Sequence, residues 1–401
     1  MIPSSPKTSM PPIRIACVVG LLQIMAWSCT YFLLAVLAAP IAQSLGLSLP
    51  VVVGGLAWGL LVAGVFAPSV GRMVDRCSGR SVLASSSILL ALGLIAIAAA
   101  DGLFTYYLAW TLLGGAMAAG LYDAAFATLG KIFGRRVRSL IPIVVLLASF
   151  SSTLGWPLIV QLQTAIGWRS ACLVLATLHV FVGLPTYLLV IPATRPSKVV
   201  RRVTSILPTA KVETRESLVF FYLATLLTCQ AFIVSCLSVH LLEVLRVSGV
   251  NADSVLVVGM AIGPAQAIPL VLEYIAGHRW HPTWSARLAM FFSLLAMTCL
   301  VLQPAQMALP AAMLYGAGNG MLTIARGALP LSLFGVESYG KYLGMLARPM
   351  LFAQACGPVL AALLLSSSGT TVLMSGMWAL ALLGFATSFL LPLSAKRLVT
   401  P

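Results

Sequence analysis

Long apolar stretches alternate with short polar breaks along the whole chain. Many of these stretches reach the length of roughly 20 residues that an α-helix needs to cross the hydrocarbon core of a bilayer. Glycine, proline and charged residues gather in the breaks, where they favour turns. The pattern predicts an all-α membrane protein with twelve transmembrane helices at residues 14–41, 50–70, 82–100, 104–129, 140–163, 170–191, 217–241, 253–275, 287–303, 308–330, 343–366 and 371–392.

The composition agrees with this pattern and leaves little room for anything else. Of the 401 residues, 60% are hydrophobic and only 8% are charged, which is too few charges for a water-exposed surface. Twelve spans would use most of the apolar residues, so we expect no additional soluble domain. The eight cysteines and four histidines show no metal-ligand spacing, and we predict neither a metal site nor a cofactor.

The net charge of +15 reflects the orientation of the chain in the membrane and does not indicate nucleic-acid binding. With the N-terminus placed inside, Arg169 and Arg246 are the basic residues of the outer loops, and Arg326 and Arg348 fall within spans. All the other lysines and arginines then lie in inner segments, as the positive-inside rule requires. We therefore predict two cytoplasmic termini, a lipid bilayer as the surroundings and no nucleic-acid partner.

The two halves of the chain show an internal repeat at a constant offset. Pro68 matches Pro269, Gly115 matches Gly316, Pro157 matches Pro358, and the pair Phe133-Gly134 matches Phe334-Gly335. The repeat predicts two pseudo-symmetric six-helix bundles at 1–192 and 217–401, joined by a basic cytoplasmic linker at 193–216.

The loop after the second predicted span identifies a family. It carries Gly71, Asp75, Arg76, Gly79 and Arg80, and this spacing resembles the signature loop of the major facilitator superfamily, with one additional residue before Gly79. The resemblance covers the whole chain and implies the fold of that superfamily. It also implies that Asp75 faces the beginning of the eleventh helix, near residues 341–344, and acts there as a gating latch.

Ionisable residues inside spans are costly and often functional. Asp123 and Arg326 lie in the fourth and tenth spans, which line the central cavity in the superfamily. We predict Asp123 as a proton site or an ion-pair partner and Arg326 as an anion-binding group, with structural ion pairs as the alternative for both. Arg348 and Glu273 lie near the inner surface and are predicted to be structural or gating charges.

Polar and aromatic side chains on the expected cavity helices complete the candidate substrate site. Trp27 and Tyr31 are four residues apart and so share one helix face, where they form either an aromatic wall for a substrate or a packing stripe. The remaining candidates are Gln23, Tyr122, Gln230, Asn319 and Thr323.

The chain shows no nucleotide-binding motif and no hydrolytic triad, so we predict a secondary active transporter and not an enzyme. The small-residue-rich fourth and fifth spans resemble the monocarboxylate and oxalate/formate branch. That resemblance favours a proton-coupled permease, a symporter, for a small organic solute such as an organic anion. A proton-driven exporter of drugs and a non-transporting sensor or receptor remain alternatives. We expect a monomer in a bacterial inner membrane.

Overall fold

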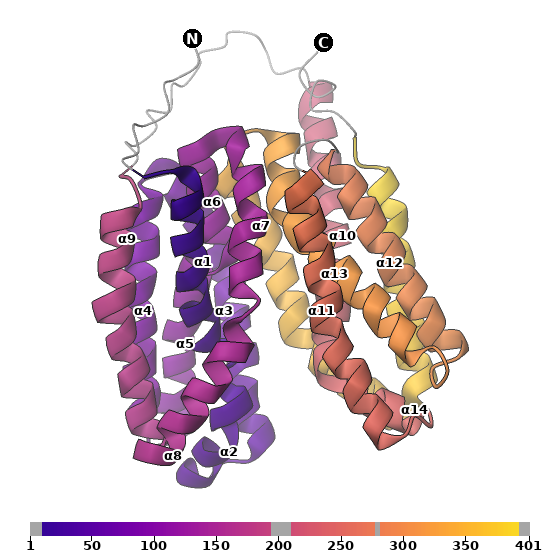
Figure 1. The fold of residues 1–401 in the computed structure, drawn as a ribbon, viewed down its shortest axis with the longest axis horizontal. Helices are drawn as coiled ribbons and strands as arrows, with labels where there is room; N and C mark the ends of the chain where they lie inside the picture. Colours follow the sequence, from indigo (N-terminus) through magenta and orange to yellow (C-terminus); the bar gives the residue numbers. More distant parts are fainter. Residues whose placement is uncertain (1–9, 194–209, 277–280, 393–401) are drawn as a thin grey trace. The chain divides into compact units, whose positions relative to one another are not determined.

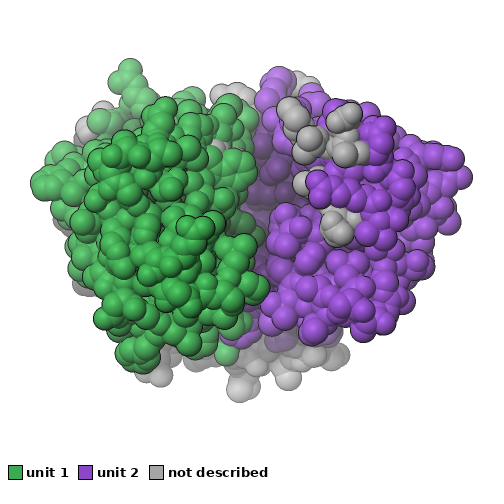
Figure 2. All heavy atoms as spheres, turned by 90° about the horizontal axis from the view of Figure 1, so that it is seen from below, with its two compact units in different colours: residues 1–200, 336–348 green, residues 201–335, 349–401 purple. Residues whose placement is uncertain are grey.

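In the computed structural model, the described residues are 10–193, 210–276 and 281–392, and every regular element among them is helical. This confirms the predicted all-α class. The predicted linker at 193–216 and both chain termini lie largely outside the described residues. The chain divides into two compact units, each with its own colour in Figure 2: unit 1 comprises residues 1–200 and 336–348, and unit 2 comprises residues 201–335 and 349–401.

Unit 1 is a bundle of helices that run roughly side by side (Figure 1). Its elements are α1 (Pro12–Ser28), α2 (Leu33–Leu45), α3 (Leu49–Arg76), α4 (Gly79–Ala98), α5 (Leu103–Gly120), α6 (Tyr122–Phe133), a 3₁₀ turn (Gly134–Arg136), α7 (Val137–Ala148), α8 (Ser151–Leu178), a π-helical segment (His179–Gly183) and α9 (Leu184–Val190). The beginning of α14, up to Arg348, also belongs to this unit.

Unit 2 contains four further helices and most of a fifth. They are α10 (Ala210–Val247), α11 (Ala252–Ala276), α12 (Pro282–Leu302), α13 (Ala308–Phe334) and α14 (Tyr339–Phe389). Its core includes the fully buried Ile233, Met297 and Ala381. The core of unit 1 is built around Tyr106 and Trp110, which are both fully buried.

Seven helical stretches among the described residues are long and apolar enough to cross a membrane. The stretch 103–190 runs through three of the predicted spans, and 339–389 runs through most of two. Gly167 and Gly369 lie at kinks within α8 and α14, where the helix turns from one predicted span into the next. Helix α13 is not among the seven. Its glycines, Asn319 and Arg326 lower its hydropathy, as expected of a helix that carries polar groups inside a protein.

Six glycines with positive φ mark the ends and kinks of these helices. They form three pairs, each with one member in either half of the chain: Gly46 with Gly249, Gly134 with Gly335, and Gly167 with Gly369. Gly134 ends α6 and Gly335 ends α13, each with its N–H bonded to the carbonyl four residues earlier. Only glycine adopts such backbone angles without strain, so similar helix ends and kinks in the two halves of the chain use the same residue type.

The structure changes the description of the predicted gating loop. Residues 71–76 are the last turns of α3, and the next helix begins at Gly79, so only Cys77 and Ser78 lie between the two helices. The polar character of Arg72, Asp75 and Arg76 suggested a loop because a water-exposed helix end has the same composition as a loop.

Candidate functional site

Three helices of unit 1 are interrupted where continuous spans were predicted. The first predicted span breaks between α1 and α2 at residues 29–32, the fourth at Leu121, and the fifth at Ser149 and Phe150. Leu121 has extended backbone angles directly after Gly120. Interrupted helices leave backbone carbonyls without their helical partners, and in transporters such breaks often border binding sites.

Gln23 connects the interruption in the fourth predicted span to α1. Its Nε2 donates to the carbonyl oxygen of Gly120 at 2.7 Å, and its Oε1 accepts from Nε1 of Trp27 at 3.1 Å. The side chain of Gln23 is fully buried. Gln23 was predicted as a substrate contact, and the structure places it behind Trp27, where it orients the indole and satisfies the free carbonyl.

The breaks in α1/α2 and α7/α8 are joined by a second hydrogen bond. Oγ of Ser28 lies 2.9 Å from the carbonyl oxygen of Ser151 and 2.7 Å from that of Ile24, so its single O–H is shared between the two acceptors. A Cβ on Gly155 would overlap the side chain of Ser28, so the glycine permits this close approach. The three interruptions are therefore held to one another by side chains of α1.

Aromatic rings gather at the interruptions and form what we call the aromatic cluster: Trp27, Tyr31, Phe32, Tyr122, Phe126 and Trp156. The ring centroid of Trp27 lies 5.5 Å from that of Tyr31 and 4.9 Å from that of Tyr122. Phe32 meets Trp156 edge-on at 5.9 Å, and Tyr122 stacks on Phe126 at 5.3 Å. Trp27, Tyr31 and Tyr122 are partly exposed, and aromatic rings of this kind can contact the apolar part of a ligand.

The predicted candidates Trp27, Tyr31 and Tyr122 thus come together, whereas Phe32 and Phe126 were not predicted. Phe126 is four residues after Tyr122, a spacing that could have indicated a shared face. Phe32 falls in the break between α1 and α2, so helical periodicity does not place it with Trp27.

Asp123 directly follows Tyr122 and lies in the first turn of α6. The helix dipole favours a carboxylate there. The side chain is partly exposed. The structure therefore places the predicted proton-site candidate beside the aromatic cluster.

The candidates of unit 2 lie on two helices. On α13, Asn319, Thr323 and Arg326 are partly exposed at spacings of four and three residues, which puts them on one face of a largely buried helix. On α10, Gln230 is 3% exposed, and neither its oxygen nor its nitrogen has a hydrogen-bond partner among the described residues. A buried amide without hydrogen bonds lowers the stability of the fold. Gln230 can therefore accept and donate hydrogen bonds to a ligand or to water.

Asp75 holds the beginning of α14 within unit 1. Its Oδ1 accepts from the backbone N–H of Gly340 at 3.0 Å, and its Oδ2 accepts from the N–H of Lys341 at 2.6 Å. These amides belong to the first turn of α14, where N–H groups lack helical partners and the dipole attracts negative charge. Asp75 thus caps a helix that lies in the opposite half of the sequence.

Small residues bring α3 and α14 together around this cap. A Cβ on Gly71 would overlap the carbonyl oxygen of Gly340, and a Cβ on Gly344 would overlap that of Ala67. The fully buried Tyr339 lies against Gly130 of α6, where a Cβ would overlap its ring.

Lys131 of α6 fixes the other side of the cap. Its Nζ donates to the carbonyl oxygens of Val74 at 2.9 Å, Asp75 at 2.8 Å and Cys77, which lie in the last turn of α3 and directly after it. A cation suits this position because the helix dipole is negative there. The sequence pattern did not indicate Lys131, because the carbonyls that it binds belong to a helix remote from it along the chain.

The other predicted charges differ in their exposure. Arg76 and Arg348 are exposed, and Arg80 is partly exposed. Gly79 is buried against Thr128. Glu273 on α11 accepts a hydrogen bond from Oγ of Ser285 at 3.0 Å.

A profile of the Major Facilitator Superfamily matches residues 16–347 of this sequence, which is most of the chain. The chain belongs to the major facilitator superfamily. Membership identifies it as a multi-pass membrane transporter. Members of this superfamily are transporters and not enzymes. No curated protein matches the sequence.

Among solved structures, the superfamily fold recurs in a crystal structure of the human organic anion transporter MFSD10 (TETRAN). The match has a TM-score of 0.71 and 17% sequence identity, and it covers 94% of this chain and 100% of that chain. At this identity the likeness shows a shared fold, so the substrate of this superfamily member has to be inferred from its own residues.

We expect Gln23→Leu to lower thermal stability. The exchange keeps the approximate size of the side chain but leaves the carbonyl of Gly120 and Nε1 of Trp27 without their partner, at a cost of about 1–3 kcal/mol. The melting temperature of the purified protein measures this effect, and Gln161→Leu at an exposed position of α8 is the matched control. Equal melting temperatures for the two variants would contradict the assigned role of Gln23.

Proposed function

We propose that this transporter carries a small organic anion together with protons by alternating access. The observation that carries the proposal is the gathering of three interrupted helices around the aromatic cluster, directly beside Asp123. Partly exposed aromatic rings bind the apolar body of an organic solute, and a carboxylate at a helix N-terminus can exchange a proton.

Arg326 is the proposed anion-binding residue. It shares one face of α13 with Asn319 and Thr323, whose hydroxyl donates to the carbonyl oxygen of Asn319 at 2.8 Å. A guanidinium binds a carboxylate through two parallel hydrogen bonds, and neighbouring amide and hydroxyl groups add further polar contacts. MFSD10, which shares the fold, is described as an organic anion transporter, and this is consistent with the proposed substrate class.

Helix α6 connects the proposed substrate site to the proposed gate. Its beginning carries Tyr122 and Asp123. Near its end, Gly130 contacts Tyr339, and Lys131 binds the end of α3. A helix of 12 residues is a stiff connection. A change in protonation or occupancy at Asp123 can therefore alter the position of the residues that hold the first turn of α14.

A screen by thermal shift tests the proposal. The purified protein is mixed with small carboxylates, amino acids, sugars and cationic drugs at two pH values. A ligand at about 100 times its Kd raises the free energy of unfolding by about 2.7 kcal/mol. We expect carboxylates to raise the melting temperature and Arg326→Ala to weaken this binding about tenfold or more, since it removes charge-assisted hydrogen bonds.

The control is Arg246→Ala, which removes an exposed arginine from the last turn of α10. Carboxylate binding that survives in Arg326→Ala would contradict the assigned role of this residue. Binding of carboxylates without any flux into proteoliposomes would contradict transport and would favour a sensor.

The second candidate function is proton-driven export of organic cations. The observation that favours it is the position of Asp123 next to Tyr122 and Trp27, because a carboxylate and aromatic faces together attract cations. Stabilisation by cationic drugs that is lost in Asp123→Asn would replace the anion proposal with this one.

A further inference from the structure

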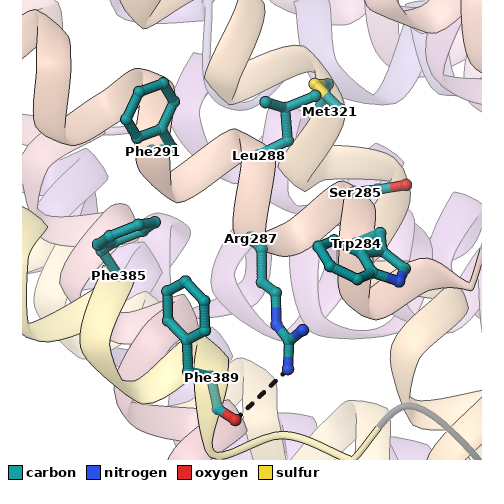
Figure 3. Close-up of a pocket in the computed structure, with 8 residues that line it drawn as sticks. All are labelled: Trp284, Ser285, Arg287, Leu288, Phe291, Met321, Phe385 and Phe389. Carbon is teal, nitrogen blue, oxygen red and sulfur yellow. Dashed lines mark hydrogen bonds between the residues drawn. The ribbon is translucent and has the colours of Figure 1, made fainter.

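A groove with a volume of about 470 Å³ opens on unit 2 between the beginning of α12 and the end of α14 (Figure 3). Its walls are largely apolar, and they include Trp284, Leu288 and Phe291 from α12 and Phe385 and Phe389 from α14. Arg287 supplies a positive charge to this lining. The groove is separate from the candidate residues on α10 and α13 that the proposed function uses.

Arg287 is held along one edge only. Its Nε donates to the carbonyl oxygen of Ser388 at 3.3 Å, and its Nη2 donates to those of Phe389 at 3.4 Å and Leu391 at 3.3 Å. The centre of the guanidinium lies 5.0 Å from the ring centroids of Trp284 and Phe389. Nη1 makes no hydrogen bond to any described residue, so its two N–H donors remain for a ligand.

An apolar stripe on α12 continues from the level of the guanidinium. Trp284, Leu288, Phe291 and Leu295 follow one another at spacings of four, three and four residues, and they are 54%, 38%, 43% and 37% exposed. These spacings place the four side chains on one face of the helix. The stripe is about 16 Å long, close to the thickness of one leaflet of the hydrocarbon core at about 15 Å.

The sequence segments that supply the lining residues favour an anion. The sequence contains no Asp or Glu between Glu273 and Glu337 or after Glu337, and these segments include all the lining residues. Glu273 itself is hydrogen-bonded to Ser285. In the sequence, Arg279 precedes α12, and Lys396 and Arg397 follow α14. Basic residues at the end of a span attract anionic lipid headgroups.

We propose that the groove binds an anionic phospholipid. The phosphodiester accepts hydrogen bonds from Nη1 of Arg287, and one acyl chain lies along the stripe from Trp284 to Leu295. A soluble phosphate would use the cation alone, whereas this site combines a cation with an apolar face of acyl-chain length.

The test uses the full chain in vesicles and the fluorescence of Trp284. Phosphatidylglycerol or phosphatidylcholine with brominated acyl chains is added at increasing fractions, and the quenching that disappears in Trp284→Phe is assigned to this residue. We expect phosphatidylglycerol to quench it at lower fractions than phosphatidylcholine. Arg287→Gln should weaken the apparent affinity for phosphatidylglycerol about tenfold, because it removes a charge-assisted contact.

The matched control is Arg169→Gln. Arg169 also stacks on a neighbouring tryptophan, at 4.3 Å from Trp168, and also binds carbonyl oxygens at a helix end, those of Ala98 and Ala100. Its exchange should leave the lipid preference at Trp284 unchanged.

Two results would overturn the proposal. One is an equal response of Trp284 to both lipids in the wild-type protein, which decides the question even if Arg287→Gln does not fold. The other is relief of the quenching by millimolar inorganic phosphate, which would identify the occupant as a soluble anion.

Discussion

Asp75→Asn is expected to reduce solute flux about tenfold or more while membrane insertion and helix content stay unchanged. Asp75 binds two N–H groups in the first turn of α14 with its two carboxylate oxygens. Asparagine keeps one acceptor but turns an NH₂ group toward the second N–H. Loss of one charge-assisted bond and of the interaction with the helix dipole costs about 2 kcal/mol, which shifts a conformational equilibrium about thirtyfold.

The measurement is uptake into proteoliposomes together with the circular dichroism of the same sample. Asp101→Asn is the matched control, because Asp101 is an exposed acid whose carboxylate accepts from Oγ1 of Thr105 within its own helix start. Normal flux in the Asp75 variant would show that the cap on α14 is structural and does not contribute to gating.

Gly71→Ala is expected to lower both flux and thermal stability, although alanine is the better helix former. Its Cβ would overlap the carbonyl group of Gly340, and a backbone atom cannot rotate away as a flexible side chain can. Overpacking of this kind costs about 1–3 kcal/mol and sometimes more. The helices must then separate, which lengthens the hydrogen bonds of the neighbouring Asp75.

Gly115→Ala on α5 provides the contrast. A Cβ at that position has no neighbour within 4 Å, so we expect no loss and a gain of about 0.5–1 kcal/mol from helix propensity. Melting temperatures and flux of the two variants separate close packing from the general effect of a glycine exchange. A Gly71 variant as stable and active as the Gly115 variant would disprove the tight contact.

The hydrophobic pattern predicted the helices well because membrane burial selects apolar residues over a fixed length. It did not predict the interruptions at residues 29–32, at Leu121 and at 149–150. Such short breaks leave the mean hydropathy of a span unchanged, and here none of them contains proline or glycine. Gln23 bonds the carbonyl oxygen of Gly120 at one break and Ser28 bonds that of Ser151 next to another, contacts that only a three-dimensional structure can show.

The candidate residues were predictable where chemistry alone marks them. A carboxylate in an apolar span pointed to Asp123, and the spacing of Trp27 and Tyr31 pointed to an aromatic face. Lys131, Phe32 and Arg287 were not predictable as contacts, since their partners are remote in sequence or lie across a helix break.

The paired glycines with positive φ also bear on the origin of the chain. When a segment is duplicated, both copies begin with the same residues at their turns. Later substitutions accumulate first at positions where many residue types are tolerated. Gly134 and Gly335 persist because any other residue would be strained there. Gly71 and Asp75 have Leu272 and Ala276 at the repeat offset. The two halves thus share glycines at corresponding helix ends, while the acid that caps α14 stands in the first half alone.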